Sequence, residues 1–148
     1  MQTSYKTKPA MYMLGLPTPN AVTEYITLMP TAITQYGQAV KRGATAGTVA
    51  PIAVDGTTDK VVGVTVRRHN DAGQYAIAEE ATIMTKGAIA VEVLSTDTVA
   101  EGESAYMIVA STNFGKFTKT AGSNTVACGV FQSVKDNGLA VVKFDIVA

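Results

Sequence analysis

The C-terminal part of the chain contains the stretch that decides the fold class. Residues 126–134 read VACGVFQSV, residues 135–138 read KDNG, and residues 139–147 read LAVVKFDIV. Both long runs are rich in β-branched and aromatic residues, which favour pleated strands. Asn137-Gly138 is the preferred pair for a two-residue type I′ hairpin turn, because both positions need a positive φ. We therefore predict a β-hairpin in which Phe131 lies opposite Phe144 on the apolar face that enters the core.

Similar segments recur along the rest of the chain, each of strand length and each ended by turn residues. They span residues 22–28, 38–41, 48–54, 61–67, 75–78, 81–85, 88–93, 105–109 and 116–118. Lys86-Gly87 is expected to be a turn between two of these strands, and residues 70–73 are expected to close a hairpin between 61–67 and 75–78. Short strands with turn signals at such regular spacing are typical of β-sandwiches and β-barrels.

The composition agrees with an all-β domain. The chain has 148 residues, which favours a single domain with a core of its own. It contains 20 Thr and 18 Val but only 5 Leu, and Val and Thr suit strands whereas helices depend more on Leu. The predicted fold is therefore all-β, a small β-barrel or β-sandwich of the β-tulip or jelly-roll-like kind, formed by residues 21–148.

The charge balance limits the classes of partner. The chain has 12 Lys+Arg and 12 Asp+Glu, so its net charge is zero. A nucleic-acid-binding protein needs an excess of basic residues to displace counterions, so no nucleic-acid partner is expected. A neutral chain with a mean hydropathy of +0.17 has little charge repulsion between its copies, which favours self-association.

Residues 1–20 are predicted to form an extended N-terminal arm ahead of the β-domain. Pro9, Pro17 and Pro19 discourage a helix or a central strand, and an apolar cluster lies between the first two. A lone domain would not leave such a cluster in water, so we expect the arm to lie across a neighbouring subunit. The residues expected to contact this partner are Tyr5, Met11, Tyr12, Met13, Leu14 and Leu16.

The same region admits a second interpretation, as a secretory signal peptide. Lys6 and Lys8 precede the apolar run 10–16, and an exported β-sandwich of the surface or adhesin type would need such a signal. The run is short and is followed by Pro17 without a small-x-small cleavage site, so the arm is the favoured interpretation. No stretch approaches the roughly 18 apolar residues of a membrane-spanning helix, and no membrane partner is expected.

The single Cys, Cys128, and the single His, His69, limit the possible chemistry. One Cys cannot form an internal disulfide, and the two residues cannot supply the four ligands of a structural zinc site. Cys128 lies in a strand-like run and His69 in a turn, so a catalytic Cys–His pair is not expected. Neither residue is predicted to be needed for function.

The remaining charged clusters are interpreted as surface features. Adjacent strand positions point to opposite faces, so Glu79-Glu80 is interpreted as a solvated bend rather than as an acid–base pair. Arg67 and Arg68 are interpreted as part of a solvated basic turn rather than as a docking point. No catalytic residue, no cofactor-binding residue and no metal ligand is predicted.

A series of short, glycine-containing apolar motifs runs along the chain in a fixed order. The motifs are residues 60–64 (KVVGV), 81–87 (ATIMTKG), 100–106 (AEGESAY), 128–132 (CGVFQ) and 138–144 (GLAVVKF). Over about residues 38–147 this series resembles the head decoration, or capsid cement, proteins of tailed bacteriophages. The resemblance implies a small β-barrel or β-sandwich, with an extended arm as family members often have.

The resemblance also implies a function and a set of partners. It implies a protein without catalytic activity or cofactors that binds the outer surface of a phage capsid and cements neighbouring major capsid subunits, stabilising the DNA-filled head. Proteins of this kind act as trimers at local three-folds or as dimers at two-folds, and a trimer is the favoured expectation here. The expected location is the capsid exterior of the virion, after assembly in the host cytoplasm.

Overall fold

Strands form the regular secondary structure of the part of the chain that the structure describes. The computed structural model describes residues 14–17, 22–52, 61–68, 73–109 and 113–145, and within these ranges there are eleven strands and no helix. The strands are β1 Glu24–Pro30, β2 Thr34–Gln35, β3 Ala39–Arg42, β4 Thr48–Pro51, β5 Val61–Thr65, β6 Gln74–Tyr75, β7 Ala81–Glu92, β8 Ser104–Ile108, β9 Phe117–Thr118, β10 Thr125–Phe131 and β11 Leu139–Asp145. The prediction of an all-β fold is confirmed.

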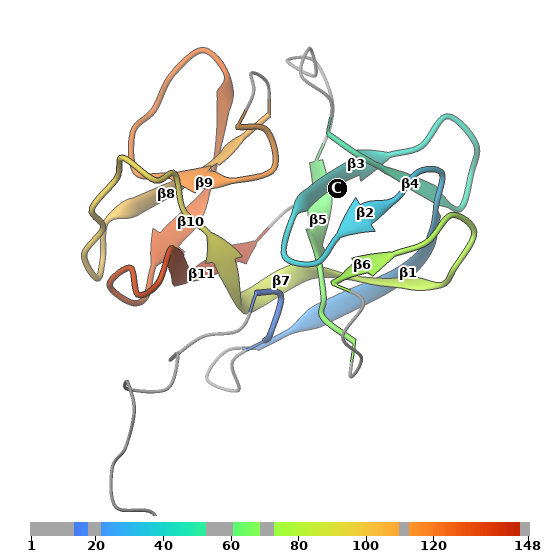
Figure 1. The fold of residues 1–148 in the computed structure, drawn as a ribbon, viewed down its shortest axis with the longest axis horizontal. Helices are drawn as coiled ribbons and strands as arrows, with labels where there is room; N and C mark the ends of the chain where they lie inside the picture. The colour runs from blue at the N-terminus through green and yellow to red at the C-terminus, as the bar shows by residue number, and fades with distance from the viewer. Residues whose placement is uncertain (1–13, 18–21, 53–60, 69–72, 110–112, 146–148) are drawn as a thin grey trace, which may run out of the picture.

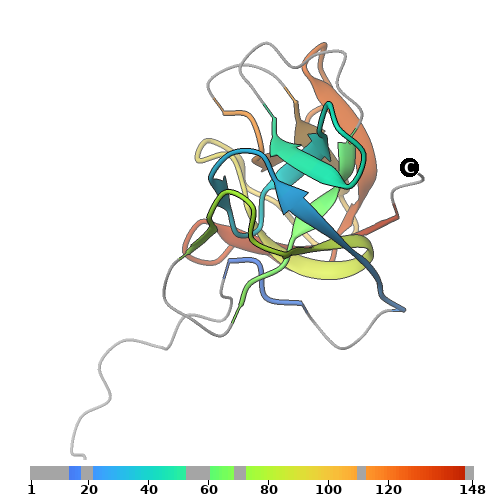
Figure 2. The same ribbon diagram turned by 90° about the vertical axis from the view of Figure 1, so that its right-hand side faces the viewer.

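Five of the strands close into a small barrel (Figures 1 and 2). The order β1-β4-β3-β5-β7 is closed by the pairing of β1 with β7. Residues of β1 alternate as a half-buried strand should: Ile26 and Leu28 pack on the barrel's own cluster, whereas Tyr25 and Met29 are exposed. The buried members of that cluster are Val40, Val49, Val62 and Ile83.

The longest strand, β7, belongs to the barrel and to a second sheet. Its first half pairs with β1 and β5, and from Lys86 to Glu92 it pairs with β11. Gly87 lies between the halves with a φ of 138°. Glycine adopts this conformation at little cost, so the strand changes direction without ending. The prediction of a turn at Lys86-Gly87 is therefore wrong, because one continuous strand passes through both residues.

Strands β11, β10, β8 and β9 extend the sheet beyond the barrel and form a second lobe (Figure 1). One face of this open sheet packs against the outer wall of the barrel. Phe117, Phe131 and Phe144 of the open sheet share a buried cluster with Val64 and Met84 of the barrel wall. The prediction that both Phe131 and Phe144 enter the core is confirmed.

The C-terminal hairpin has the predicted turn. Asp136 and Leu139 exchange two backbone hydrogen bonds of 2.8 and 3.0 Å. Asn137 and Gly138 between them have φ values of 53° and 80°, as a type I′ turn requires.

The register of the hairpin differs from the prediction. Phe131 lies opposite Val142 instead of Phe144, which is a shift of two residues. The shift arises beside the turn, where the Ser133 hydroxyl accepts a hydrogen bond of 2.9 Å from the Val141 amide. This side chain replaces a backbone acceptor, and the β10 side accommodates two more residues than the β11 side. Because the shift is even, both phenylalanines stay on the same face.

Strands β2 and β6 form a short ribbon beside the barrel, with Thr34 opposite Tyr75. The predicted hairpin between 61–67 and 75–78 is wrong, because β5 pairs with β3 and β7 while β6 pairs with β2. The rings of Tyr36 and Tyr75 pack edge to face with centroids 5.2 Å apart. With Ala81 they form a third buried cluster.

Candidate interaction surface

An open groove of about 560 Å³ crosses the sheet from β10 through β11 to β7 and to Val22, which precedes β1. Gly129, Phe144 and Gly87 are cross-strand neighbours along this groove. Two of these residues have no side chain, and the Phe144 ring is buried in the core. The floor of the groove is therefore formed by the backbone of β10, β11 and β7.

The sides of the groove carry both apolar and charged groups. Val130 and Lys143 are cross-strand neighbours on one side, and Asp145 and Lys86 are neighbours on the other. The Lys86 ammonium lies 3.9 Å from the Asp145 carboxylate, whereas no acidic side chain of the described residues forms an ion pair with the exposed Lys143. The groove therefore has an excess of positive charge beside an apolar wall.

Cys128 also lines this groove, but its thiol is poorly suited to nucleophilic chemistry. Burial raises the pKa of the Cys128 thiol to about 12, and the thiol donates a 3.3 Å hydrogen bond to the Ala105 carbonyl. A thiol with this pKa is protonated at neutral pH, and the nucleophile would be the thiolate. His69, the other half of the pair considered from the sequence, lies outside the described residues. Among the residues that are described, no group of three or more potential metal ligands comes together.

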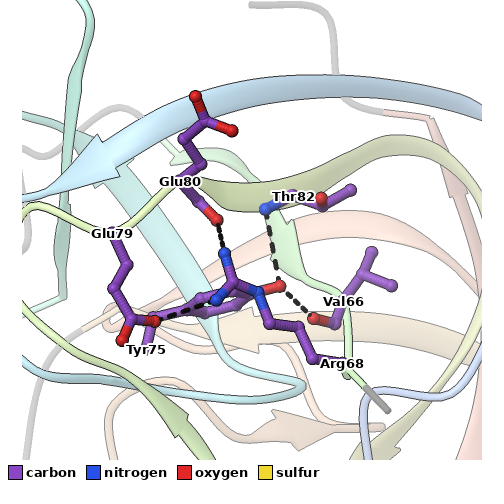
Figure 3. Close-up of polar contacts among 6 residues, drawn as sticks. All are labelled: Val66, Arg68, Tyr75, Glu79, Glu80 and Thr82. Atoms are coloured by element: carbon purple, nitrogen blue, oxygen red, sulfur yellow. Dashed lines mark hydrogen bonds and ion pairs between the residues drawn. The ribbon is translucent and has the colours of Figure 1, made fainter.

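The two adjacent glutamates are part of a structural contact around Arg68 (Figure 3). One guanidinium nitrogen of Arg68 donates a 3.0 Å hydrogen bond to the Glu79 carboxylate, and the other donates to the backbone carbonyl of Glu80. The carboxylate of Glu80 points away from Arg68. Glu79 lies in a bend, as predicted, but it is half-buried and bound to Arg68 rather than simply solvated, whereas Glu80 is exposed.

Arg68 also covers the ring of Tyr75 at 4.7 Å from its centroid, within the range of a cation–π contact. The Tyr75 hydroxyl donates to the Val66 carbonyl at 2.5 Å and accepts from the Thr82 amide at 3.4 Å. Burial raises the pKa of Tyr75. Arg67 similarly lies 5.8 Å from the centre of the Tyr36 ring. Both arginines are partly buried and stabilise the fold, so the interpretation of a simply solvated basic turn is incomplete.

Residues 14–17 of the predicted arm pack on their own domain. The Gly15 amide donates to the Ala90 carbonyl at 2.9 Å, the Ala90 amide donates to the Leu16 carbonyl at 3.1 Å, and the Arg67 amide donates to the Gly15 carbonyl at 2.7 Å. Pro17 forms an antiparallel bridge with Ile89 of β7. We call residues 14–17 the arm root.

The arm root corrects one expectation from the sequence. The expectation that the whole arm leaves its own domain is wrong for residues 14–17, which pair with β7. Pro17 can take part in this bridge because the hydrogen bonds are made by its neighbours and do not require the N–H group that proline lacks. Leu14 is half-buried, and Leu16 is 42% exposed and accessible to a partner. Tyr5, Met11, Tyr12 and Met13 lie outside the described residues.

Sequence reasoning did not identify an apolar patch at the far end of β1. Met29, Ile33 and Ile77 are 47%, 53% and 61% exposed. The Ala78 amide donates to the Pro30 carbonyl at 3.0 Å, which places the turn containing Ile77 beside the end of β1. Residues of β1 alternate between half-buried and exposed positions, but only the folded chain shows which exposed side chains another segment joins in a patch.

Comparison with known proteins gives the family. Residues 1–145 match the family model described as structural cement protein (E217 gp24/Pam3 gp6). The chain belongs to this cement family. A search of curated proteins finds no significant match. Among solved structures, a chain from "The capsid of Myoviridae Phage XM1" has the same fold, with a TM-score of 0.80 and 18% sequence identity, covering 98% of this chain and 97% of that one.

Membership of the cement family confirms the resemblance drawn from the short motifs. It supports a structural, capsid-stabilising role for the chain. The described residues contain no helix that is long and apolar enough to cross a membrane.

Proposed function

We propose that this protein binds the outer surface of a phage capsid and joins neighbouring major capsid subunits, so that the DNA-filled head resists internal pressure. The observation that carries the proposal is the match of residues 1–145 to a structural cement family. The groove and the exposed patch at the end of β1 offer surfaces for protein partners. The protein has no catalytic activity in this proposal, and it needs no cofactor, nucleic acid or membrane.

Self-association is part of the proposed function, with a trimer at a three-fold favoured over a dimer at a two-fold. The zero net charge of the chain supports this, because copies do not repel one another. The apolar side chains exposed at the end of β1 support it as well, since patches of this kind commonly mark interaction sites.

The N-terminal arm adds reach to this binding. Residues 1–13 precede an arm root that hydrogen bonds fix to β7 and to Arg67. Thirteen extended residues span at most about 45 Å, which is enough to pass over an adjoining subunit. We assign partner contacts to Tyr5, Met11, Tyr12 and Met13, and to the exposed side of Leu16. Ordering the arm on binding costs entropy and reduces the net affinity it contributes.

Addition of the purified protein to phage heads that lack it tests the proposal. The protein should co-sediment with the heads in a fixed ratio to the major capsid protein and raise the temperature at which the heads release DNA. Failure to bind heads at any concentration, or binding without any gain in head stability, would contradict the capsid-cementing function.

Deletion of residues 2–13 tests the arm separately, because it leaves the arm root in place. The truncated protein should melt at nearly the same temperature as the full chain and bind heads or other copies much more weakly. Full occupancy of heads by the truncated protein would show that the arm does not contribute to binding.

A further inference from the structure

The turn between β6 and β7 projects a preformed apolar and acidic tip. Ile77 is 61% exposed, and Ala78 beside it has a φ of 66°, which is uncommon for a residue other than glycine. Arg68 holds the turn through Glu79 and the Glu80 carbonyl, while the Glu80 carboxylate points away from Arg68 (Figure 3). The tip, residues 77–80, therefore presents one apolar side chain and one free carboxylate on a fixed backbone.

The groove described above offers the complementary chemistry. Val130, 40% exposed, stands next to Lys143 on one side of a floor of backbone. Asp145 is 3.9 Å from Lys86, so the negative charge in the groove already has a partner, and the charge of Lys143 remains available to a ligand.

We propose that the tip of one copy docks in the groove of a second copy, with Ile77 against Val130 and the groove floor and with the Glu80 carboxylate beside Lys143. The proposal rests on the self-association part of the proposed function. Repeated around a three-fold axis, the contact lets each copy give one tip and receive another, so that all three grooves are filled.

Charge distinguishes this occupant from the other segment of the chain that could enter the groove. Residues 1–20 carry Lys6 and Lys8 and no acidic residue, so the arm has the same sign of charge as Lys143. The tip carries the carboxylates of Glu79 and Glu80 two and three residues after the exposed Ile77. Because Arg68 fixes the tip before binding, docking of the tip loses little conformational entropy.

The tip and the groove of one chain lie at opposite ends of β1. The Ala78 amide donates to the Pro30 carbonyl at the end of β1, whereas Val22, which precedes β1, lines the groove. Eight residues of extended chain separate Val22 from Pro30, or roughly 25 Å. A tip therefore cannot fill the groove of its own chain, and the contact must join two copies.

A charge swap tests the contact. Glu80→Lys and Lys143→Glu should each weaken self-association about tenfold, measured by sedimentation equilibrium, because each replaces an attraction by a repulsion. The double variant should return to within about threefold of the wild type. Glu101→Lys is the matched control, since it changes an exposed carboxylate in a different turn, and it should leave association unchanged.

Disulfide trapping provides a second measurement that does not depend on electrostatics. In a Cys128→Ala background, Ile77→Cys with Val130→Cys should form covalent oligomers on oxidation. Ile77→Cys with Val134→Cys is the control, because Val134 is 54% exposed and lies outside the groove. Crosslinking in the control pair to the same extent would overturn the assignment of the groove.

Three further results would overturn the proposal. The first is a wild-type protein that stays monomeric at all concentrations and does not crosslink on heads. The second is a double charge variant that associates no better than the single variants. The third is loss of head binding in Lys143→Glu with unchanged self-association, which would make a capsid subunit the occupant of the groove and leave the capsid-cementing function standing.

Discussion

Replacement of Gly15 by alanine tests how firmly the arm root is held. Gly15 has a φ of 76°, and an added Cβ would lie 3.0 to 3.1 Å from the Gly37 amide nitrogen, the Arg67 amide nitrogen and Tyr36 Cβ. A left-handed alanine costs about 1–2 kcal/mol, and the crowded backbone atoms cannot move without breaking hydrogen bonds of their own. The three hydrogen bonds of the arm root contribute about 1 kcal/mol each, so the root should detach before the barrel rearranges.

We therefore expect Gly15→Ala to lower the free energy of unfolding by about 2–3 kcal/mol in a urea titration, the upper value being the energy of the lost hydrogen bonds. Hydrogen exchange gives the more specific signal. The amides of Arg67 and Ala90, which donate to the arm root, should lose protection. The amide of Gln132, which donates to the Val141 carbonyl, should keep it.

Gly47→Ala is the matched control. Gly47 has nearly the same φ, 79°, but nothing lies within 4 Å of the position of its Cβ. This variant should lose only the conformational cost of a left-handed alanine, about 1–2 kcal/mol, and should exchange like the wild type. If Gly15→Ala costs no more than Gly47→Ala and the amides of Arg67 and Ala90 stay protected, the arm root is not anchored in the way described here.

Three further variants and measurements test the core, the hairpin and the thiol. Phe144 is 2% exposed, so Phe144→Ala should lower the free energy of unfolding by about 3–5 kcal/mol in urea, and a loss below about 1 kcal/mol would mean that the ring is not in the core. Ser133→Ala removes the acceptor of the buried Val141 amide and should cost about 1–3 kcal/mol in the same titration; a cost near zero would show that water replaces the hydroxyl. Burial raises the pKa of Cys128 from 9.0 to about 12, so at pH 8 the thiolate population is roughly 1,000-fold smaller than for an ordinary Cys. Ellman's reagent reacts with the thiolate, so it should label the native protein slowly and the urea-unfolded protein fast. The fold favours the protonated thiol, so the free energy of unfolding should be unaffected by this group below pH 9 and should fall as the pH rises from about 9 towards 12. In Cys128→Ala, the decrease in the free energy of unfolding at alkaline pH should be smaller by this amount.

Some features of the fold could be predicted from the residues at a single site, whereas others depend on contacts between distant segments. The turn at Asn137-Gly138 follows from the φ values that only a few residues tolerate, so it could be predicted from two residues alone. The register of the same hairpin depends on the Ser133 hydroxyl replacing a backbone acceptor, and no hydrophobic pattern signals such a replacement. Gly87 gave a turn signal, but β1, β5 and β11 all supply partners to β7, and that pairing overrides the local preference for a turn.

The candidate site was less accessible to sequence reasoning because distant segments build it. The groove combines Val22 with residues near 87, 129 and 144, so its existence depends on the order of strands in the sheet. An apolar arm was predicted from the prolines and the composition of residues 1–20. The anchor at Gly15 was not, since the crowding that makes glycine necessary comes from Tyr36, Gly37 and Arg67.

The position of β7 has a mechanical consequence. The arm root runs antiparallel to β7 and is hydrogen-bonded to Ala90, so a force along the arm root is parallel to the strand. Seven residue pairs join β7 to β11 from Glu92 to Lys86, with hydrogen bonds perpendicular to that pull. Such bonds are loaded together in shear rather than opened one after another. Because β7 continues into the barrel, a force applied to the arm root would be distributed over both lobes.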